Sequence, residues 1–182
     1  MSEQFLKVIK SRRVIRVMTD KQVDREVLEK ILETARWAPA AGNQRTNRFV
    51  VVQDPVTLRL IRKFSPGMFQ KPQAVILICL DWNVVNANKF SETDTAPYMD
   101  VGATMQTIML AAHGIGLGSG PVTSFSKEAL RVILNLPDNL SPEMLICIGY
   151  AAPPSKAQLP MLKKKKVTWQ SLTHWERYKV NF

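Results

Sequence analysis

Two stretches of the sequence are apolar almost from end to end. AVILICL (74–80) and MLICIGY (144–150) each run into polar or proline-containing segments within a few residues. A continuous apolar run of this length is typical of a strand that is apolar on both faces and fully buried. FVVVQ (49–53) predicts another buried strand. With 182 residues, 46% of them hydrophobic, the chain has enough material for one globular domain with a proper core.

Between these strands the apolar residues recur at helical spacing. Asp24 and Asp54 stand where helix N-caps are expected, and Pro55 suits a first helical turn. The longest of the predicted helices is apolar around most of its circumference, which indicates a central rather than a peripheral position. The sequence thus predicts helices over residues 2–10, 24–37, 55–62, 96–113 and 127–134.

Three segments lack such a period and are expected to be loops. They are AAGNQRTNR (40–48), residues 84–95, and GIGLGSGP (114–121). Gly114 is the expected C-cap of the preceding helix. The four glycines of GIGLGSGP would let the backbone approach a ligand or another chain closely.

The composition changes after Pro153 and Pro154. Four lysines occupy 163–166, and WQSLTHWERYKVNF (169–182) follows. Such a tail cannot fold alone. Because three exposed aromatic residues are an apolar liability, we expect them to dock on the rest of the molecule or on a second chain. The chain is therefore predicted to be a single domain, 1–182, with 155–182 as a C-terminal arm.

Charge and cysteine usage narrow the possible partners. The 25 Lys and Arg against 15 Asp and Glu give a formal net charge of +10, which suits an anionic partner. Cys79 and Cys147 lie in apolar runs, which argues against a disulfide framework. The start, MSEQFLKVIKSRRVIR, has no uninterrupted apolar core typical of a signal peptide, and no apolar run is long enough to span a bilayer. We therefore expect a cytoplasmic protein without membrane association.

The familiar catalytic patterns do not fit the chain. The glycines of GIGLGSG follow a helix, whereas a dinucleotide fingerprint follows a strand and opens a helix. His113 and His174 have no second ligand at metal spacing, and neither cysteine has a neighbouring base. We predict no metal site and no catalytic side chain. Amide-rich and basic segments without an acid, base or nucleophile favour chemistry on an organic cofactor.

Several blocks of the sequence together resemble the FMN-dependent nitroreductases. Arg-Arg-Val-Ile-Arg (12–16) is similar to the Arg-Arg-Ser-x-Arg start of that family. LEKILETARWAPAAGNQRTNRFVVV (28–52) resembles its helix-to-loop signature, and YMDVGATMQTIMLAAHGIGLGSGPVTSF (98–125) resembles its central helix and glycine turn. The basic segment before HWERY resembles its closing motif. The resemblance implies an α+β fold, a three-layer α-β-α sandwich with a mainly antiparallel central sheet flanked by helices.

The resemblance also implies a cofactor site. Its residues would be three arginines and two lysines at the phosphate and ribitol side, two loop residues near the flavin ring, and a turn beside the isoalloxazine: Arg12, Arg13, Arg16, Lys164, Lys166, Asn43, Arg45, Pro121, Thr123 and Ser124. Guanidinium and ammonium groups suit a phosphate, while amides and backbone N–H groups suit ring carbonyls and nitrogens. At four places the chain departs from the family pattern. Val14 replaces a serine, Arg45-Thr46-Asn47 replaces Gln-Pro-Trp, Thr123 replaces an acid of some members, and Ser124 a glycine.

The implied activity is that of an NAD(P)H-dependent flavin oxidoreductase. A hydride would pass from NAD(P)H to flavin N5 and then to a nitroaromatic or quinone-like acceptor. FMN would lie in clefts at the interface of a homodimer whose C-terminal segments are exchanged. Two alternatives remain open, namely an FMN carrier or sensor without turnover, and a basic nucleic-acid-binding domain. The second is disfavoured because no helix-turn-helix, RNA-binding or zinc motif is present.

Overall fold

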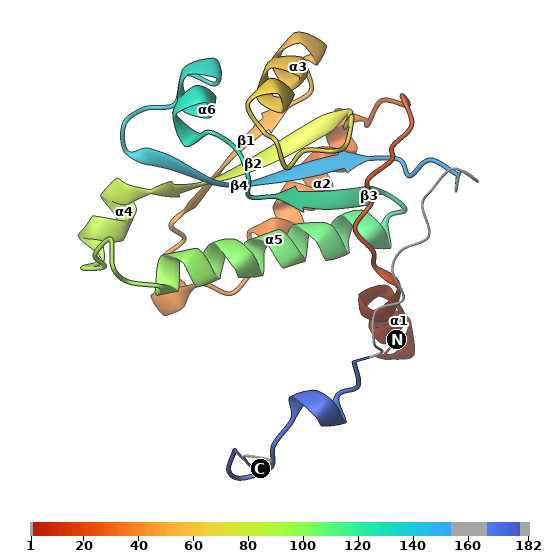
Figure 1. Cartoon of the computed structure of the whole chain (residues 1–182). Coiled ribbons are helices and arrows are strands. Elements are labelled where there is room, and N and C mark those ends of the chain that lie inside the picture. Colours follow the sequence, from red (N-terminus) through yellow and green to blue (C-terminus); the bar gives the residue numbers. More distant parts are fainter. Residues whose placement is uncertain (1, 154–166, 179–182) are drawn as a thin grey trace. The chain divides into compact units, whose positions relative to one another are not determined.

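A four-stranded antiparallel sheet forms the middle layer of the chain (Figure 1). The computed structural model describes residues 2–153 and 167–178, so Lys164 and Lys166 lie outside the described residues. The chain divides into two units, Met1–Ala152 and Pro153–Phe182. The sheet belongs to the first unit and has the order β1-β2-β4-β3. Its strands are β1 (Asn47–Val52), β2 (Ala74–Asp81), β3 (Gly118–Val122) and β4 (Leu140–Gly149).

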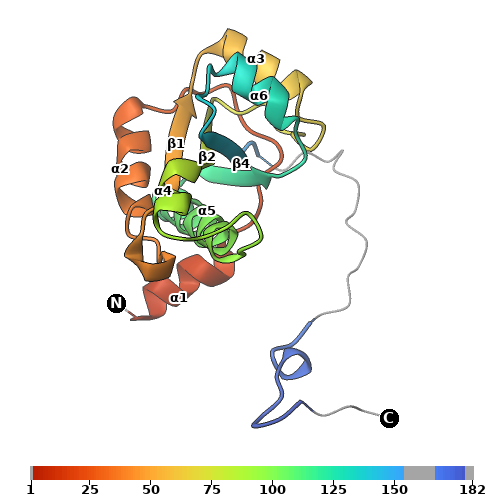
Figure 2. The ribbon, with the colours of Figure 1, turned by 90° about the vertical axis from the view of Figure 1, so that its left-hand side faces the viewer.

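Helices cover both faces of this sheet (Figure 2). Helices α2 (Arg25–Ala35) and α5 (Ala96–Gly114) lie on one face. Helices α3 (Pro55–Lys63) and α6 (Lys127–Ile133) lie on the other. The three-layer α-β-α arrangement predicted from the sequence is thus confirmed.

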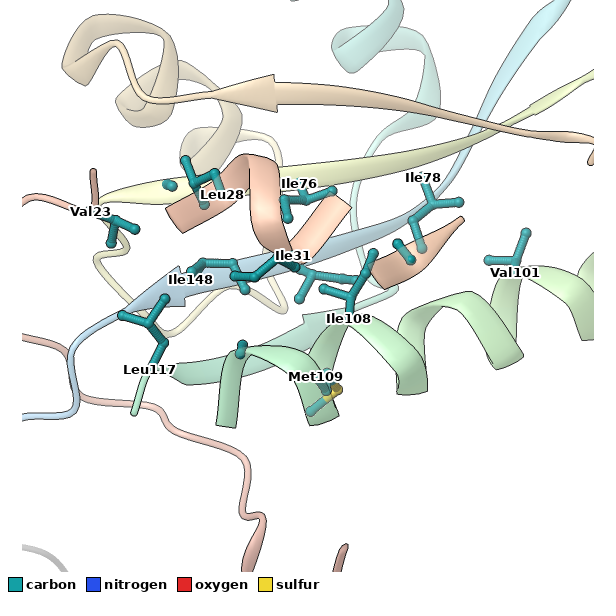
Figure 3. Packing of buried hydrophobic residues seen from close by; sticks show 14 of the residues in the cluster. Val23, Leu28, Ile31, Ile76, Ile78, Val101, Ile108, Met109, Leu117 and Ile148 are labelled. Carbon is teal, nitrogen blue, oxygen red and sulfur yellow. The ribbon is translucent and has the colours of Figure 1, made fainter. Parts of the chain in front are cut away.

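The strand β2 shows why the sheet needs two helical layers, because all eight of its residues are buried. Successive side chains of a strand point to opposite faces. Ile76 and Ile78 accordingly pack with Leu28, Ile31 and helix α5 on one side (Figure 3). Val75, Leu77 and Cys79 pack with Ile61 of α3 and Leu130 of α6 on the other. The unbroken apolar run in the sequence is the direct consequence.

Helix boundaries follow the predicted caps closely. Asp54 accepts hydrogen bonds from the Thr57 N–H and hydroxyl, both at 2.7 Å, and Pro55 occupies the first turn of α3. The same two bonds lower the pKa of Asp54, because they favour its charged form. Asp24 stands at the N-cap of α2 as predicted, although its side chain caps no N–H group.

One predicted loop contains a helix. Residues 84–95 were expected to be irregular, whereas α4 spans Trp82–Ala87. Asp81 begins this helix by accepting a hydrogen bond from Asn83 N–H at 3.2 Å. Asn139 and Arg48 hold the same carboxylate, at 2.8 and 3.1 Å. Because six residues are too few to show a helical period, the sequence gives no sign of α4.

The glycine-rich segment 114–121 is also more regular than predicted. Gly114 is the last residue of α5 and not its C-cap, and the left-handed residue is Gly116, with φ of 84°. The Leu117 N–H donates to the Ala112 carbonyl at 2.8 Å and the Gly116 N–H to that of His113 at 3.1 Å, which closes the helix. From Gly118 the segment continues as β3 rather than as a loop.

The chain before α2 runs along the free edge of β3. Helix α1 (Ser2–Ser11) leads into it, and a parallel bridge joins Val14 to Ser119. The Ile15 N–H donates to the Ser119 carbonyl at 2.9 Å. A Cβ on Gly118 would lie 2.8 Å from the Ile15 side chain. The glycine therefore permits this close approach of the chain to itself.

The second unit is described at Pro153 and over residues 167–178. It contains a short 3-10 helix, η2 (Gln170–Leu172), and stacked rings of His174 and Tyr178 with centroids 4.0 Å apart. Trp169 and Trp175 are largely exposed. Docking of the arm remains a prediction. Within the described ranges no helix has the length and apolar character that a membrane crossing requires.

Candidate functional site

Arg12 carries the clearest sign of a missing anionic partner. Its Nε and Nη1 atoms are buried, and neither has a hydrogen-bond partner among the described residues. Buried donors of a charged group are costly to leave unpaired. A phosphate oxygen accepts such charge-assisted bonds, so Arg12 fits the FMN phosphate implied by the sequence.

Arg13 and Arg16 extend this group, and we call residues 12–16 the arginine segment. Arg13 Nη1 donates to the carbonyls of Lys10 and Arg12, at 2.7 and 2.8 Å, and its side chain is exposed. Arg16 is exposed and forms no ion pair within residues 2–153 and 167–178. The bridge between Val14 and Ser119 places the arginine segment beside β3.

The predicted turn beside the flavin ring begins at the end of β3. Pro121 lies on this edge strand, where its missing N–H leaves no ladder bond unmade. Thr123 and Ser124 follow and are exposed. The Ser124 carbonyl accepts a hydrogen bond from Gly67 N–H at 3.1 Å, which holds the turn against the segment that follows α3. The structure thus brings Pro121, through β3, next to the arginine segment.

Gln70 is a polar residue at this place that sequence reasoning missed. It is only 2% exposed, its Nε2 donates to the Ile15 carbonyl at 3.2 Å, and its Oε1 is buried without a partner in the described structure. A Cβ on Gly120 would lie 2.3 Å from Nε2, so the glycine makes room for the amide. A single glutamine between a helix and a strand carries no pattern that would reveal it.

A second cluster lies on residues 38–46, which we call the amide loop. It contains the short 3-10 helix η1 (Ala41–Asn43). Gly42, Asn43 and Arg45 all have positive φ, of 56°, 57° and 54°. For Asn43 and Arg45 this conformation is strained and requires support from neighbours.

Helix α5 supplies much of this support. The Ala41 N–H donates to both carboxylate oxygens of Asp100, and each N···O distance is 3.0 Å. The Asn47 Nδ2 donates to the Asp100 carbonyl at 3.3 Å and to the Thr104 hydroxyl at 2.8 Å. Asp100 is 7% exposed, so the carboxylate is held inside the structure by the amide loop.

The side chain of Arg45 points to its own loop. Its Nη1 donates to the Ala38 carbonyl at 2.7 Å, and the residue lines a cavity of about 330 Å³ together with Trp37. Asn43 is exposed. Neither residue has a described contact with the arginine segment.

The two clusters are held at opposite ends of α5. Ser11 Oγ lies 2.8 Å from His113 Nε2, just before Arg12, whereas the amide loop is held by Asp100. His113 comes 13 positions after Asp100, which corresponds to about 20 Å along the helix axis. Within one copy of the chain, the arginine segment therefore lies far from Asn43 and Arg45.

The cysteines offer no nucleophile. Burial raises the pKa of both the Cys79 and the Cys147 thiols to about 12. Both are free and buried, as predicted. Within the described ranges no three His, Cys, Asp or Glu residues form a potential metal site.

Comparison with known proteins shows which family this chain resembles. A sequence profile described as "Nitroreductase family" matches residues 9–90 and 73–150. A putative NADH dehydrogenase/NAD(P)H nitroreductase of Archaeoglobus fulgidus is 34% identical over 81% of this chain and 86% of its own. An FMN reductase [NAD(P)H] of Bacillus subtilis is 26% identical, over 96% and 74% of the two chains.

A solved structure agrees with the sequence relatives. A nitroreductase family protein of Clostridium difficile superposes with a TM-score of 0.78 at 27% identity, covering 95% of this chain and 98% of its own. The chain belongs to the nitroreductase family.

Proposed function

We propose that this protein binds FMN at the interface of a homodimer and passes a hydride from NAD(P)H to a nitroaromatic or quinone-like acceptor. Membership of the nitroreductase family makes it an NAD(P)H-dependent flavin oxidoreductase. We further propose that the flavin is FMN, that the acceptor is a nitroaromatic or a quinone, and that the protein is a homodimer. The single observation that carries it is that Arg12 has two buried nitrogens without a partner, two residues before the bridge that joins Val14 to β3.

When bound, FMN would supply the site that takes up a hydride from NAD(P)H and gives it to the acceptor. Arg12 would hold the phosphate through Nε and Nη1, with Arg13 and Arg16 adding positive charge along the same segment. Lys164 and Lys166, outside the described residues, are proposed to complete this cation group. The positive charges of these arginines and lysines would stabilise the dianionic phosphate of FMN without any proton transfer.

The ring side of the site is proposed on two elements. Pro121, Thr123 and Ser124 would pass beside the ring, where backbone N–H groups meet its nitrogens and carbonyls. A hydrogen-bond donor near flavin N1 and the C2 carbonyl would stabilise the negative charge of the reduced ring. Asn43 and Arg45 would approach from the amide loop. No side chain acts as a nucleophile, because orientation over the ring supplies the catalysis.

The distance along α5 supports a dimeric site. Because about 20 Å of helix separates the two anchor points, one flavin meets both clusters only if they belong to different copies. A two-fold axis across α5 would set its N-terminal half against the C-terminal half of the partner copy. The outward residues of α5 suit such a contact, since Met99 is 67% exposed and Gly102 and Ala103 are small.

The dimer is tested by a charge on this face. Met99→Arg is expected to shift the sedimenting species from dimer to monomer and to weaken FMN retention, because a buried unpaired charge is costly. Val132→Arg is the matched control, since Val132 is 82% exposed on α6, on the other side of the sheet. A Met99→Arg protein that remains dimeric with full FMN would remove α5 from the interface.

The activity is tested by the visible spectrum of the purified protein before and after anaerobic NADH or NADPH. Bleaching of a flavin band, followed by recovery when a quinone or a nitroaromatic is added, is the expected result. A bound flavin that stays oxidised would favour the carrier. A colourless protein that takes up no FMN would overturn the proposal and would direct attention to nucleic acid, tested by salt-dependent binding.

A further inference from the structure

Helix α3 carries apolar side chains on two of its sides. Ile61 is fully buried, and together with Leu58 it packs toward the sheet. Val56, Leu60 and Phe64 follow one another at a spacing of four residues, which places them in one row along the helix. Their side chains are 54%, 39% and 46% exposed. A row of apolar residues thus faces solvent although α3 already has a side that faces the core.

Two cations lie beside this apolar row. At about 100° per residue, Arg59 and Lys63 fall next to Val56 and on the side of the helix opposite Ile61. Both are exposed, and neither forms an ion pair within residues 2–153 and 167–178. The carboxylate of Asp54 is already used as the cap of this helix. We call the following residues the α3 outer face: Val56, Arg59, Leu60, Lys63 and Phe64.

The cations of the neighbouring helix α6 are balanced, in contrast to those of α3. Lys127 pairs with Glu143 at 2.6 Å, and Arg131 pairs with Asp138 at 2.8 Å. An exposed cation without a counter-ion keeps its charge available for an outside partner. In this helical layer, α3 rather than α6 therefore offers free positive charge.

No other element of residues 2–153 covers this layer. Figure 1 and Figure 2 show α3 and α6 side by side on one face of the sheet, with no further helix or strand of that range outside them. The Ser126 N–H donates to the Phe64 carbonyl at 2.9 Å, which joins the start of α6 to the end of α3. Val132 on α6 is 82% exposed and adds another apolar side chain to the layer.

Charge decides which partner suits the α3 outer face. A second copy of the chain carries a formal net charge of +10, and residues 154–166, outside the described residues, include the four lysines 163–166. Either would bring like charge against Arg59 and Lys63, which is unfavourable. A bilayer with anionic lipids offers phosphates for the cations and, just beneath them, an apolar boundary for the row of apolar side chains.

We propose that the α3 outer face binds the surface of a membrane that contains anionic lipids. Leu60 and Phe64 would enter the boundary between headgroups and acyl chains, while Arg59 and Lys63 would stay at the level of the phosphates. The sequence-based expectation of no membrane association rested on the lack of a signal peptide and of a spanning apolar run, and surface binding requires neither. The proposal goes beyond the flavin chemistry and does not depend on it, because α3 shares no residue with the proposed flavin site.

The test is co-sedimentation of the full-length protein with vesicles of phosphatidylcholine and phosphatidylglycerol, compared with vesicles of phosphatidylcholine alone. We expect binding to the anionic vesicles only, and weaker binding at higher salt because exposed charges are screened. Arg59→Gln combined with Lys63→Gln should weaken binding about 25-fold, since each basic residue near an anionic surface contributes about a factor of five.

Two further variants separate the apolar row from net charge. Leu60→Gln leaves the charge unchanged and should also weaken binding, because an apolar side chain no longer enters the boundary. Arg25→Gln combined with Lys30→Gln is the matched control, since it removes two exposed cations from α2, on the other face of the sheet. This control should bind the anionic vesicles as the parent does.

Several outcomes would overturn the proposal. Binding to both kinds of vesicle equally, binding to neither, an α3 double variant that binds like the α2 control, or a Leu60→Gln protein that binds like the parent would each do so. If Leu60→Gln does not fold, Val56→Gln replaces it, because Val56 is 54% exposed. Sedimentation without vesicles is run in parallel, and self-association that Leu60→Gln abolishes would assign this face to a second copy instead. None of these measurements reads the flavin, so the result stands whether or not the flavin proposal holds.

Discussion

Replacing Arg12 by Met should change FMN affinity and the stability of the flavin-free protein in opposite directions. Methionine keeps most of the apolar stem but removes the two buried nitrogen atoms that lack partners. Unpaired buried donors cost about 1–3 kcal/mol in the flavin-free state. The variant should therefore unfold with an unchanged or larger free energy, by up to that amount.

The loss of FMN affinity follows from the same two atoms. One charge-assisted hydrogen bond to a phosphate contributes about 1.5–3 kcal/mol. Since about 1.4 kcal/mol corresponds to a factor of ten, losing one such bond raises the Kd by about 10- to 150-fold. Loss of both Nε and Nη1 should place the result toward the upper part of this interval.

The assay combines urea unfolding of flavin-free protein with fluorescence titration by FMN, at one fixed protein concentration because a dimer's stability depends on it. Arg59→Met is the control, since this residue is exposed and belongs to helix α3 and not to the arginine segment. A variant that is less stable without flavin and binds FMN as tightly as the parent would refute the reasoning. Arg12 would then be a structural residue of the segment between α1 and α2.

Three further predictions concern the supports of the site and the buried thiols. Asp100→Ala should lower the free energy of unfolding by about 1–3 kcal/mol in urea, because the Ala41 N–H loses both carboxylate oxygens; an unchanged midpoint would contradict this. Gly120→Ala should cost about 1–3 kcal/mol, since its Cβ would lie 2.3 Å from Gln70 Nε2, and the added change Gln70→Ala should recover part of that loss. Cys79 and Cys147, with thiol pKa values of about 12, should react with a thiol reagent at pH 8 only after unfolding. Their raised pKa also means that stability is kept below the unfolded thiol value near 9 and is lost as pH rises from there toward 12. Rapid labelling of the native protein at pH 8 would contradict the burial of these thiols.

Local patterns of residues were enough to locate the buried strands and most of the helices. The apolar run 74–80 required cover on both sides, and the structure provides α2 and α5 on one face and α3 and α6 on the other. Periodicity located five helices, and Asp54 with Pro55 marked the start of α3. The arginine segment was also visible, because charge clusters and motif order are local properties of the chain.

The placement of the site residues depends on contacts between segments that are distant in the sequence. Helix α4 was missed because six residues show no helical period, and the Asp81 carboxylate that begins it is held by the distant Arg48 and Asn139. Strand β3 was missed because it forms by pairing with β4, which is a contact between distant residues. Gln70 became a site residue through Ile15 and Gly120, 50 or more positions away. The cavity at Arg45 arises where α2, β1 and α5 meet. Burial, unpaired donors and separation along α5 depend on which segments pack together, and no local pattern of residues contains that information.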